Sequence, residues 1–321
     1  MQGDRVFVSG AGGFIGRWSV PALLRSGHEV HAVLSGSAGR DVPGQLCGAK
    51  IHFADLLDAS RVEELMRDIR PSHLLHFAWI TTPGLYWNSE ENFRWLKASE
   101  HLLHCFGTQG GRRVMMAGSC AEYDWSRAEE CDELRSPLAN SATTALSPYA
   151  ACKIALQASL ADFGSRNRVS TAWGRIFFQF GPYEHPDRLV PYVISNLLLN
   201  REAACSHGKQ VRSFLHVADV GAAFAAVLQS EVEGAVNIGS DERVSLADLI
   251  GRIARQIGRP ELVRLGVRPS PPQEPLILIP DVHRLNDEAR WLPRFSLDEG
   301  LADTIAWWRG ILRSPTGTAA S

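Results

Sequence analysis

Short apolar runs alternate with longer amphipathic segments over the first two-thirds of the chain. A short apolar run bounded by turn residues predicts a buried strand, and apolar positions at helical spacing predict a helix. Six runs are predicted to be buried strands: 5–10, 29–34, 49–55, 73–79, 112–119 and 169–178. Four amphipathic segments between them are predicted to be helices: 14–27, 60–70, 86–106 and 147–164. This alternation indicates an α/β fold with a doubly wound parallel sheet and helices on both of its faces.

The pattern changes after about residue 178. A strand followed by a helix is predicted at 212–230, another strand at 235–240, and a Pro-rich connector at 268–280. Further helices are predicted at 187–200, 245–258 and 286–310. We therefore expect a first domain at 1–178, to which 212–238 return, and a smaller C-terminal α/β part. That part comprises 179–211 and 239–313, and 314–321 are expected to form a flexible tail.

The composition excludes several classes of function. The 321-residue chain is 45% hydrophobic and 21% charged, with a net charge of −2, so no basic surface for nucleic acid or an anionic membrane is expected. No apolar run approaches the ~20 residues of a membrane span, and the start of the chain does not resemble a secretion signal, so a cytoplasmic location is expected. The six Cys are scattered without metal-ligand spacing, so we expect reduced thiols and no metal site.

Three glycines follow the first predicted strand at G-x-x-G-x-x-G spacing: Gly10, Gly13 and Gly16. Glycines let the backbone turn tightly and approach a pyrophosphate, whose charge is bound by the first N–H groups of the next helix. Phe14 and Ile15 belong to the same turn. The first domain is therefore predicted to be a Rossmann-type dinucleotide-binding domain.

The residues after the second strand bear on the choice between NADP and NAD. Ser35 stands where an acidic residue would accept a bond from the ribose 2′-hydroxyl, and Arg40 follows, so a 2′-phosphate and hence NADP is favoured, with NAD still possible. Alternatively, Arg40 is a solvated loop residue and Asp41 folds back to the ribose. Asp55 is expected near the adenine or as a cap of the following helix. The remaining residues expected along the cofactor are Leu56, Phe77 and Ala78.

Tyr149 and Lys153 are four residues apart in a predicted helix, so their side chains share one face. An ammonium close to a phenol lowers the phenol pKa from about 10 toward neutrality. Such a pair can donate and accept a proton at neutral pH. The alternative is a coincidence on an exposed helix face.

Taken together, these motifs resemble the extended short-chain dehydrogenases/reductases of the nucleotide-sugar epimerase/dehydratase/reductase type. The resemblance covers about residues 4–310 and is carried, in order, by GAGGFIG (10–16), HFAW (76–79), Ser119 in AGSCAEY, YAACK (149–153), GRIFFQFGP (174–182), RSFLHVADV (212–220) and AVNIGS (235–240). It implies a catalytic set of Ser119, Tyr149 and Lys153. It also implies that Lys153 contacts the nicotinamide ribose, and that the protein forms a homodimer through the helices at 86–106 and 147–164.

Two positions depart from reactions known in that family. Its dehydratases have an Asp–Glu pair directly after the catalytic hydroxyl residue, where this chain has Cys120 and Ala121. Neither side chain can serve as the acid and base for loss of water. The fucose-synthase type has a Cys where Ala121 stands, so double epimerisation is not expected either.

The substrate site is expected to include Glu122, Phe178, His185, Arg188 and Arg212. Glu122 is either a salt-bridged structural acid or a substrate contact. Phe178 replaces the Asn that many sugar epimerases use on the substrate. His185 and Arg188 border the expected cleft unless their loop is merely solvated. By the resemblance, Arg212 holds the nucleotide diphosphate; the alternative is a structural ion pair.

The motifs around 119–125 and 173–191 are most similar to deoxysugar ketoreductases. We therefore expect NADPH-dependent reduction of the ketone of a nucleotide-linked 4-keto-6-deoxysugar. The first alternative is a C4 epimerase with tightly held NAD. A second alternative, from another class, is a non-catalytic protein that senses dinucleotides.

Overall fold

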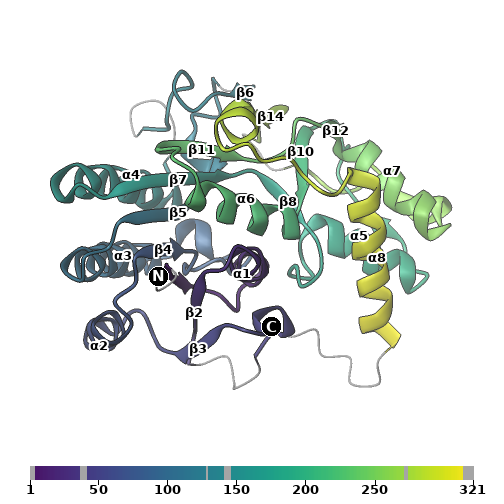
Figure 1. The fold of residues 1–321 in the computed structure, drawn as a ribbon. Coiled ribbons are helices and arrows are strands. Elements are labelled where there is room, and N and C mark those ends of the chain that lie inside the picture. Colours follow the sequence, from purple (N-terminus) through teal and green to yellow (C-terminus); the bar gives the residue numbers. More distant parts are fainter. Residues whose placement is uncertain (1–3, 37–41, 128, 141–145, 271–273, 314–321) are drawn as a thin grey trace.

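A seven-stranded sheet lies at the centre of the larger part of the molecule (Figure 1). The structure, a computed structural model, describes residues 4–36, 42–127, 129–140, 146–270 and 274–313. The strand order is β11-β7-β5-β4-β1-β2-β3, and all neighbours are parallel. The strands are β1 (Arg5–Ser9), β2 (Glu29–Leu34), β3 (Lys50–Phe53), β4 (His73–His76), β5 (Arg113–Ser119), β7 (Ser170–Ile176) and β11 (Gly234–Ile238). The expected doubly wound parallel sheet is confirmed.

Helices cover both faces of this sheet, which is why its central strands are apolar along their whole length. In β5, for example, every residue before Ser119 is buried. One face packs against α1 (Gly16–Arg25) and α6 (Val217–Gln229). The other face packs against α2 (Ala59–Ile69), α3 (Glu91–Thr108) and α4 (Pro148–Asn167).

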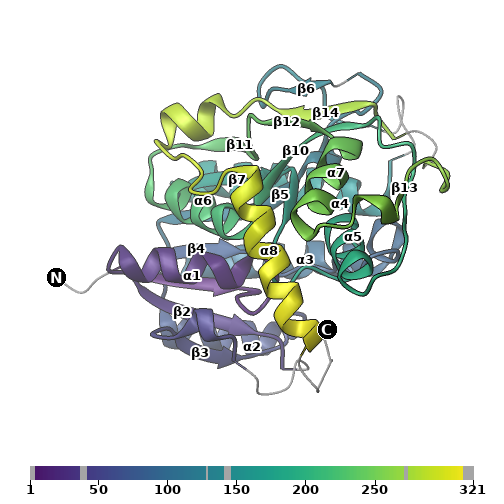
Figure 2. The same cartoon turned by 90° about the vertical axis from the view of Figure 1, so that its right-hand side faces the viewer.

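The smaller part of the molecule is built on a second sheet of order β12-β10-β14-β6, in which β8 also pairs with β10. Helices α5, α7 and α8 share one apolar core beside it and lie close together in Figure 2. A short two-stranded sheet, β13-β9, completes this part. The elements are β6 (Glu130–Cys131), β8 (Phe178–Phe180), α5 (Leu189–Leu198), β9 (Ala203–Ala204), β10 (Val211–His216), β12 (Arg243–Ser245), α7 (Leu246–Ile257), β13 (Val263–Arg264), β14 (Ile277–Pro280) and α8 (Leu297–Arg313).

The chain passes from one sheet to the other within a single predicted strand. The run 169–178 divides into β7 of the large sheet and β8 of the second sheet, with Phe177 between them. Likewise, only part of 212–238 returns to the large sheet. Strand β10 pairs with β8, β12 and β14, whereas α6 and β11 return. Because β7 and β8 lie within one largely apolar run, the sequence pattern does not mark the change of sheet at Phe177.

Three other boundaries differ from the sequence-based expectation. In the segment 286–310, a short π-helical turn at Arg284–Glu288 is followed by non-helical residues, and α8 starts at Leu297. The segment 86–106 begins as a 3₁₀ turn at Tyr86–Asn88, and α3 starts at Glu91. The Pro-rich connector contains β14, which pairs with β10 and β6 because Ile277–Ile279 supply the N–H groups that proline lacks. Among the described helices, none is long and apolar enough to span a membrane.

Candidate active site

The glycine turn connects β1 to α1 and lies against the backbone that follows β4, the strand beside β1 where the strand order reverses. Gly10 has a φ of +63°, and a Cβ there would lie 2.8 Å from the Ala78 nitrogen. Any larger residue would therefore clash with the backbone after β4. Helix α1 begins without a side-chain cap and without an acidic residue in its first turn. Its N-terminus therefore suits the pyrophosphate of a dinucleotide.

A buried polar chain fixes the backbone beside this turn. Ser9 Oγ accepts hydrogen bonds from the Phe77 and Ala78 nitrogens at 3.1 and 3.3 Å, and it lies 2.6 Å from His76 Nδ1. His76 Nε2 lies 2.8 Å from Ser99 Oγ, whose proton goes to the Trp95 carbonyl. His76 therefore donates from Nε2 and accepts at Nδ1. Burial lowers the pKa of His76 to about 3, so the ring is neutral.

Ser119 lies at the carboxyl end of β5 and is held by its own backbone turn. Its Oγ accepts a hydrogen bond from the Ala121 nitrogen, and its nitrogen donates to Glu122 Oε1 at 2.7 Å. These reciprocal bonds form a capping box. They leave the hydroxyl proton of Ser119 available for a neighbouring oxygen.

Helix α4 brings Tyr149 and Lys153 to the same end of the sheet. Pro148 occupies the first turn, and the side chain of Ser147 accepts a hydrogen bond from the Ala150 nitrogen, so the helix begins directly before Tyr149. Tyr149 is hydrogen-bonded to Ser119. Lys153 Nζ lies 6.0 Å from the Tyr149 ring centroid and donates to the Ala117 carbonyl at 2.9 Å. The three residues implied by the resemblance are therefore neighbours, and the exposed-face alternative is wrong, since Tyr149 and Lys153 are both buried.

The expected lowering of the Tyr149 pKa by Lys153 is not found in this structure. Burial raises the pKa of Tyr149 above its usual value of about 10, and the hydrogen bond with Ser119 offsets only part of this. Lys153 points instead at the Ala117 carbonyl and at the face of Trp79, whose centroid is 3.8 Å from Nζ. Burial lowers the pKa of Lys153 to about 7. Tyr149 is therefore a neutral phenol at neutral pH.

Glu122 is a structural acid, and the alternative of a substrate contact is wrong. Its carboxylate is fully buried. It pairs with Arg175 Nε at 2.9 Å and accepts a hydrogen bond from Trp173 Nε1 at 2.9 Å, in addition to the bond from Ser119. The hydrogen bonds and the ion pair of the Glu122 carboxylate are thus made with buried protein groups and with the Ser119 turn.

Arg212 is likewise occupied by the protein. Its side chain is buried, and it donates to Glu274 Oε1 at 2.9 Å and to the carbonyls of Val211, Pro275 and Leu276. Only its Nε is buried without a partner in the part of the chain that the structure describes. The guanidinium lies 5.2 Å from the Phe178 ring. This geometry corresponds to the structural ion pair rather than to the expected fork on a diphosphate.

The remaining expected cofactor residues follow the strand ends. Gly13 and Ser35 are exposed, and Gly16 is buried at the start of α1. Asp55 is exposed and accepts a hydrogen bond from the Leu57 nitrogen, while Asp58 rather than Asp55 caps α2. Arg40 and Asp41 lie outside the described residues. The half-buried side chains of this group are Phe14, Ile15, Phe77 and Ala78, and Leu56 is buried.

The loop after β8 carries the other two expected substrate residues. His185 is exposed and accepts a hydrogen bond from the Asp187 nitrogen at 3.3 Å within its own loop. Arg188 is also exposed, and its guanidinium lies 5.6 Å from the ring of Tyr86, which in turn contacts Tyr149. The structure therefore brings Arg188, but not His185, towards the catalytic set. Glu184 of the same loop is buried, and one of its oxygens has no partner among the described residues.

Aromatic residues around Tyr149 were not foreseen from the sequence. Tyr86 and Trp87 pack edge-on against Tyr149, Trp125 packs on Trp87, and Trp79 lies against Lys153. The sequence feature that could have predicted them is the aromatic pair Tyr86–Trp87, which closely follows a Pro-Gly dipeptide in the segment after β4. The carboxyl ends of parallel strands are where such sheets place their ligands.

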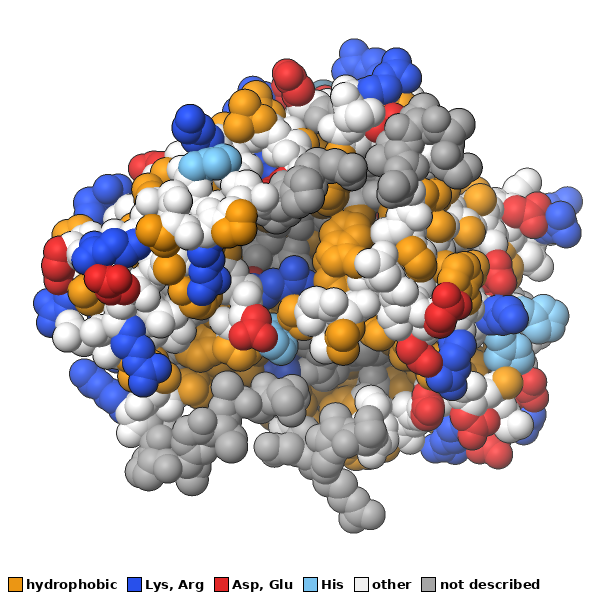
Figure 3. Space-filling model, turned by 180° about the vertical axis from the view of Figure 1, so that it is seen from behind, with side chains coloured by type: hydrophobic (Ala, Val, Ile, Leu, Met, Phe, Trp, Pro, Cys, Tyr) orange, Lys and Arg blue, Asp and Glu red, His pale blue; other side chains and the backbone are white. Residues whose placement is uncertain are grey.

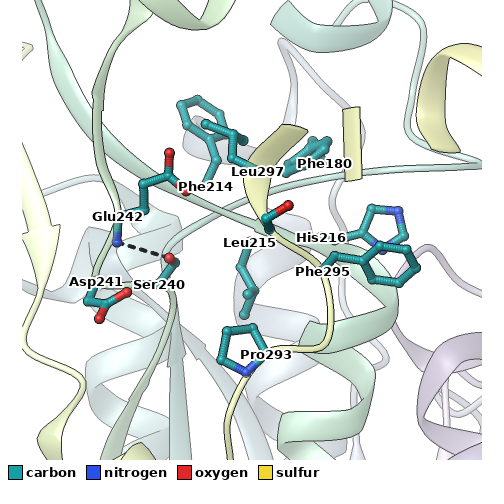
Figure 4. Close-up of a pocket in the computed structure, with 11 residues that line it drawn as sticks. Phe180, Phe214, Leu215, His216, Ser240, Asp241, Glu242, Pro293, Phe295 and Leu297 are labelled. Carbon is teal, nitrogen blue, oxygen red and sulfur yellow. Dashed lines mark hydrogen bonds between the residues drawn. The ribbon is translucent and has the colours of Figure 1, made fainter. Parts of the chain in front are cut away.

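Two depressions are visible in the molecule. Figure 3 shows a hollow near the middle of the side opposite to Figure 1, where hydrophobic side chains and a Lys or Arg side chain reach the surface. A separate cavity of about 230 Å³ lies beside β10 and the segment before α8, lined by Phe180, Phe214, Asp241, Glu242 and Phe295 among others (Figure 4). None of the catalytic set lines this cavity. Of its polar side chains, Glu242 is engaged within the protein, since it pairs with Arg252 and its nitrogen donates to Ser240.

The parallel sheet, the glycine turn and the Ser119–Tyr149–Lys153 set define an enzyme of the extended short-chain dehydrogenase/reductase class, which uses a nicotinamide dinucleotide. Among the described residues, no His, Cys, Asp and Glu side chains gather into a group that could hold a metal ion. The chain belongs to the NAD dependent epimerase/dehydratase family, whose sequence profile matches residues 6–239.

Curated relatives cover nearly the whole chain at low identity. The dTDP-D-glucose 4,6-dehydratase of Mus musculus is 26% identical over 335 residues, covering 95% of this chain and 88% of the relative. A dTDP-4-dehydro-6-deoxy-D-allose reductase from a Streptomyces species is also 26% identical, over 324 residues, covering 96% and 97%. These relatives catalyse different reactions, so the family alone does not determine the reaction of this chain.

Solved structures share the fold over the same length. The UDP-glucose 4-epimerase of Thermotoga maritima has a TM-score of 0.83 at 20% identity, covering 96% of this chain and 100% of that one. The UDP-glucose 4-epimerase of Thermus thermophilus, solved in complex with NAD, has a TM-score of 0.79 at 25% identity, covering 95% and 99%.

Proposed function

We propose that this protein reduces the ketone of a nucleotide-linked 4-keto-6-deoxysugar with a nicotinamide dinucleotide. The observation that carries the proposal is the position of Tyr149, whose buried phenol lies beside Ser119 in the first turn of α4 and can donate a proton there. Reduction of a ketone needs a proton donor at this position. An epimerase must also remove a proton from the same hydroxyl, which a phenol with a raised pKa does less readily.

The positions after Ser119 further restrict the reaction. Cys120 is buried, and burial raises the pKa of its thiol to about 12, so it stays protonated and inert. Ala121 has no titratable group. Dehydration, the activity named for the mouse relative, therefore lacks the acid–base pair after Ser119 that it requires. Ketone reduction, the activity named for the Streptomyces relative, needs only the proton donor Tyr149.

The residues of this chain divide the work as follows. Ser119 donates a hydrogen bond to the ketone oxygen and orients it, and Tyr149 transfers its phenolic proton to the same oxygen. Lys153 holds the nicotinamide ribose. When bound, the dinucleotide supplies the hydride that reduces the carbonyl carbon. The aromatic side chains around Tyr149 exclude water from this transfer.

NADPH is the proposed cofactor. The support is Ser35, a short exposed hydroxyl where NAD-binding sheets of this type carry an acid at the end of the second strand. The smaller part, 179–211 and 239–313, is proposed to contribute to the substrate site. A homodimer through α3 and α4 is also part of the proposal.

The test is a reduction assay with purified enzyme and dTDP-4-keto-6-deoxyglucose, using NADPH and, separately, NADH. We expect one equivalent of NADPH to be consumed per ketone, with a higher kcat/KM for NADPH than for NADH. Conversion of UDP-glucose to UDP-galactose without added cofactor, by enzyme that purifies with NAD bound, would instead establish the C4 epimerase.

The assay also separates catalysis from dinucleotide sensing. Tyr149→Phe should keep cofactor binding and lower kcat by at least about 100-fold, because acid catalysis contributes roughly 10²–10⁴-fold. Tyr192→Phe, which removes a phenol on α5 that accepts a bond from Arg268, is the matched control and should retain full turnover. Retention of more than about a tenth of kcat by Tyr149→Phe would contradict the assigned role.

A further inference from the structure

Three aromatic side chains line the approach to the catalytic phenol. The ring centroids of Tyr86 and Trp87 lie 4.9 and 5.6 Å from that of Tyr149, and Trp125 lies 5.8 Å from Trp87. Tyr86 and Trp87 come from the turn after β4, and Trp125 follows β5. We call Tyr86, Trp87 and Trp125 the aromatic wall.

The aromatic wall is anchored by buried hydrogen bonds. Asn92 is fully buried and donates to the carbonyls of Tyr86 at 2.6 Å and Ser89 at 2.8 Å. Its Oδ1 accepts a bond from Trp79 Nε1 at 2.8 Å, and the Trp79 ring holds the Lys153 ammonium. The turn that carries the wall is thus tied to the catalytic lysine, so it is a built part of the site.

The polar atoms of the wall already have partners in the protein. Trp125 Nε1 donates to the Cys120 carbonyl at 3.0 Å. The hydroxyl of Tyr86 is hydrogen-bonded to Trp87 and to Arg188. Since indole has a single donor, Trp87 and Trp125 offer a ligand only their ring surfaces.

A surface of this kind distinguishes a methyl group from a hydroxymethyl group. Ring faces attract C–H groups, whereas a hydroxyl pressed against them loses its bonds to water without replacement. In the proposed reaction, C6 of the sugar is attached to the ring carbon beside the ketone. C6 is either a methyl group or a hydroxymethyl group. The aromatic wall favours the methyl group.

We infer that the aromatic wall is a specificity determinant that selects a 4-ketosugar nucleotide with a methyl group at C6 over the same ketone with a hydroxymethyl group. This inference rests on the proposed function. An apolar pocket rejects an added hydroxyl by only about 10²-fold at most. The expected preference in kcat/KM is therefore between about tenfold and a hundredfold.

The experiment compares dTDP-4-keto-6-deoxyglucose with dTDP-4-ketoglucose at saturating NADPH. Wild type should prefer the deoxy ketone by the stated factor. Trp87→Ala should reduce this preference to about threefold or less, mainly by loss of kcat/KM on the deoxy ketone. Trp87→Phe should restore most of the preference because it returns a ring face.

Leu85→Ala is the matched control from the same turn. Leu85 is 65% exposed, so its removal should leave both the preference and the basal rate unchanged. Loss of the preference in this variant would mean that any disturbance of the turn abolishes selection, which would overturn a specific role of the rings.

The failures of the two proposals differ. Reduction of both ketones with equal kcat/KM by wild type, or an unchanged preference in Trp87→Ala, would overturn the inference and leave the proposed function standing. Reduction of neither ketone by enzyme that binds NADPH would overturn the proposed function and the inference together. Reduction of a nucleotide-free aromatic ketone with the same kcat/KM as dTDP-4-keto-6-deoxyglucose would overturn the inference, because the aromatic wall would then serve a different class of substrate.

Discussion

At the scale of single residues, burial rather than the nearest charge decides how the site titrates. The i, i+4 spacing correctly places Tyr149 and Lys153 together, but spacing does not show which way an ammonium points. Here it points at a carbonyl and an indole face rather than at the phenol, while burial raises the pKa of Tyr149 and lowers that of Lys153. Positions could therefore be predicted from the sequence, whereas protonation states required the surrounding packing.

Glu122 gives the first residue-scale prediction. Glu122→Gln should lower the free energy of unfolding by about 3–5 kcal/mol, because it leaves the buried Arg175 guanidinium without its counter-charge. Urea denaturation measures this loss. The KM for the sugar nucleotide should change little in the fraction that stays folded. A raised KM for the sugar nucleotide with unchanged stability would contradict the structural role and support a contact between Glu122 and the substrate.

Glu184 gives a pH-dependent prediction. Burial raises the pKa of its carboxyl to about 8, against an ordinary value of 4.5. Between these values the folded state holds one more proton than the unfolded state, so this residue makes stability fall as pH rises from about 4.5 to 8. Glu184→Gln mimics the protonated form and should raise Tm above that of wild type at pH 8 but not at pH 4.5.

The control for this measurement is Glu231→Gln, which removes one charge at an exposed position. Thermal unfolding of the three proteins across the pH range gives the comparison. A difference between Glu184→Gln and wild type that is the same at both ends of the range would contradict a buried, protonated carboxyl.

At the scale of elements, the sequence pattern located strands better than it located their partners. The run 169–178 has one uninterrupted apolar character, yet it serves two sheets, because Phe178–Phe180 pairs with Phe214–His216. The segment 268–280 was expected to be only a connector, yet β14 pairs with β10 there. Pairing depends on contacts between distant segments, which local periodicity does not encode.

Arg212 gives the element-scale prediction, because it ties β10 to the segment before β14. Arg212→Lys keeps the charge but loses the planar fork that reaches Glu274 and three carbonyls. Unfolding free energy should fall by roughly 1.5–3 kcal/mol, since bonds to a charged group are lost. The KM for the sugar nucleotide should stay the same. A KM raised several-fold at unchanged Tm would instead support diphosphate binding.

At the scale of the whole molecule, the fold class and the closeness of Tyr149 and Lys153 could be predicted because each follows from a local motif. The glycine turn, the strand–helix alternation and the Tyr149–Lys153 spacing all lie within short segments. The aromatic wall could not be predicted in the same way, since it joins residues after two different strands around a third element. Its members acquire a shared role only when β4, β5 and α4 are packed together.

The passage of the chain between the two sheets has a consequence for synthesis. When a nascent chain has emerged from the ribosome as far as Phe178, six of the seven strands of the large sheet are present, but α6 and β11 are not. Phe224 of α6 packs against Gly174 and Met115, so the part of that face that α6 covers is bare until residues 217–229 follow. The unfinished sheet exposes an apolar surface and an unpaired edge at β7, which is the kind of intermediate that chaperones bind. A stalled or truncated chain ending near residue 178 would therefore be a poor substitute for a dinucleotide-binding domain and a ready substrate for aggregation or quality control.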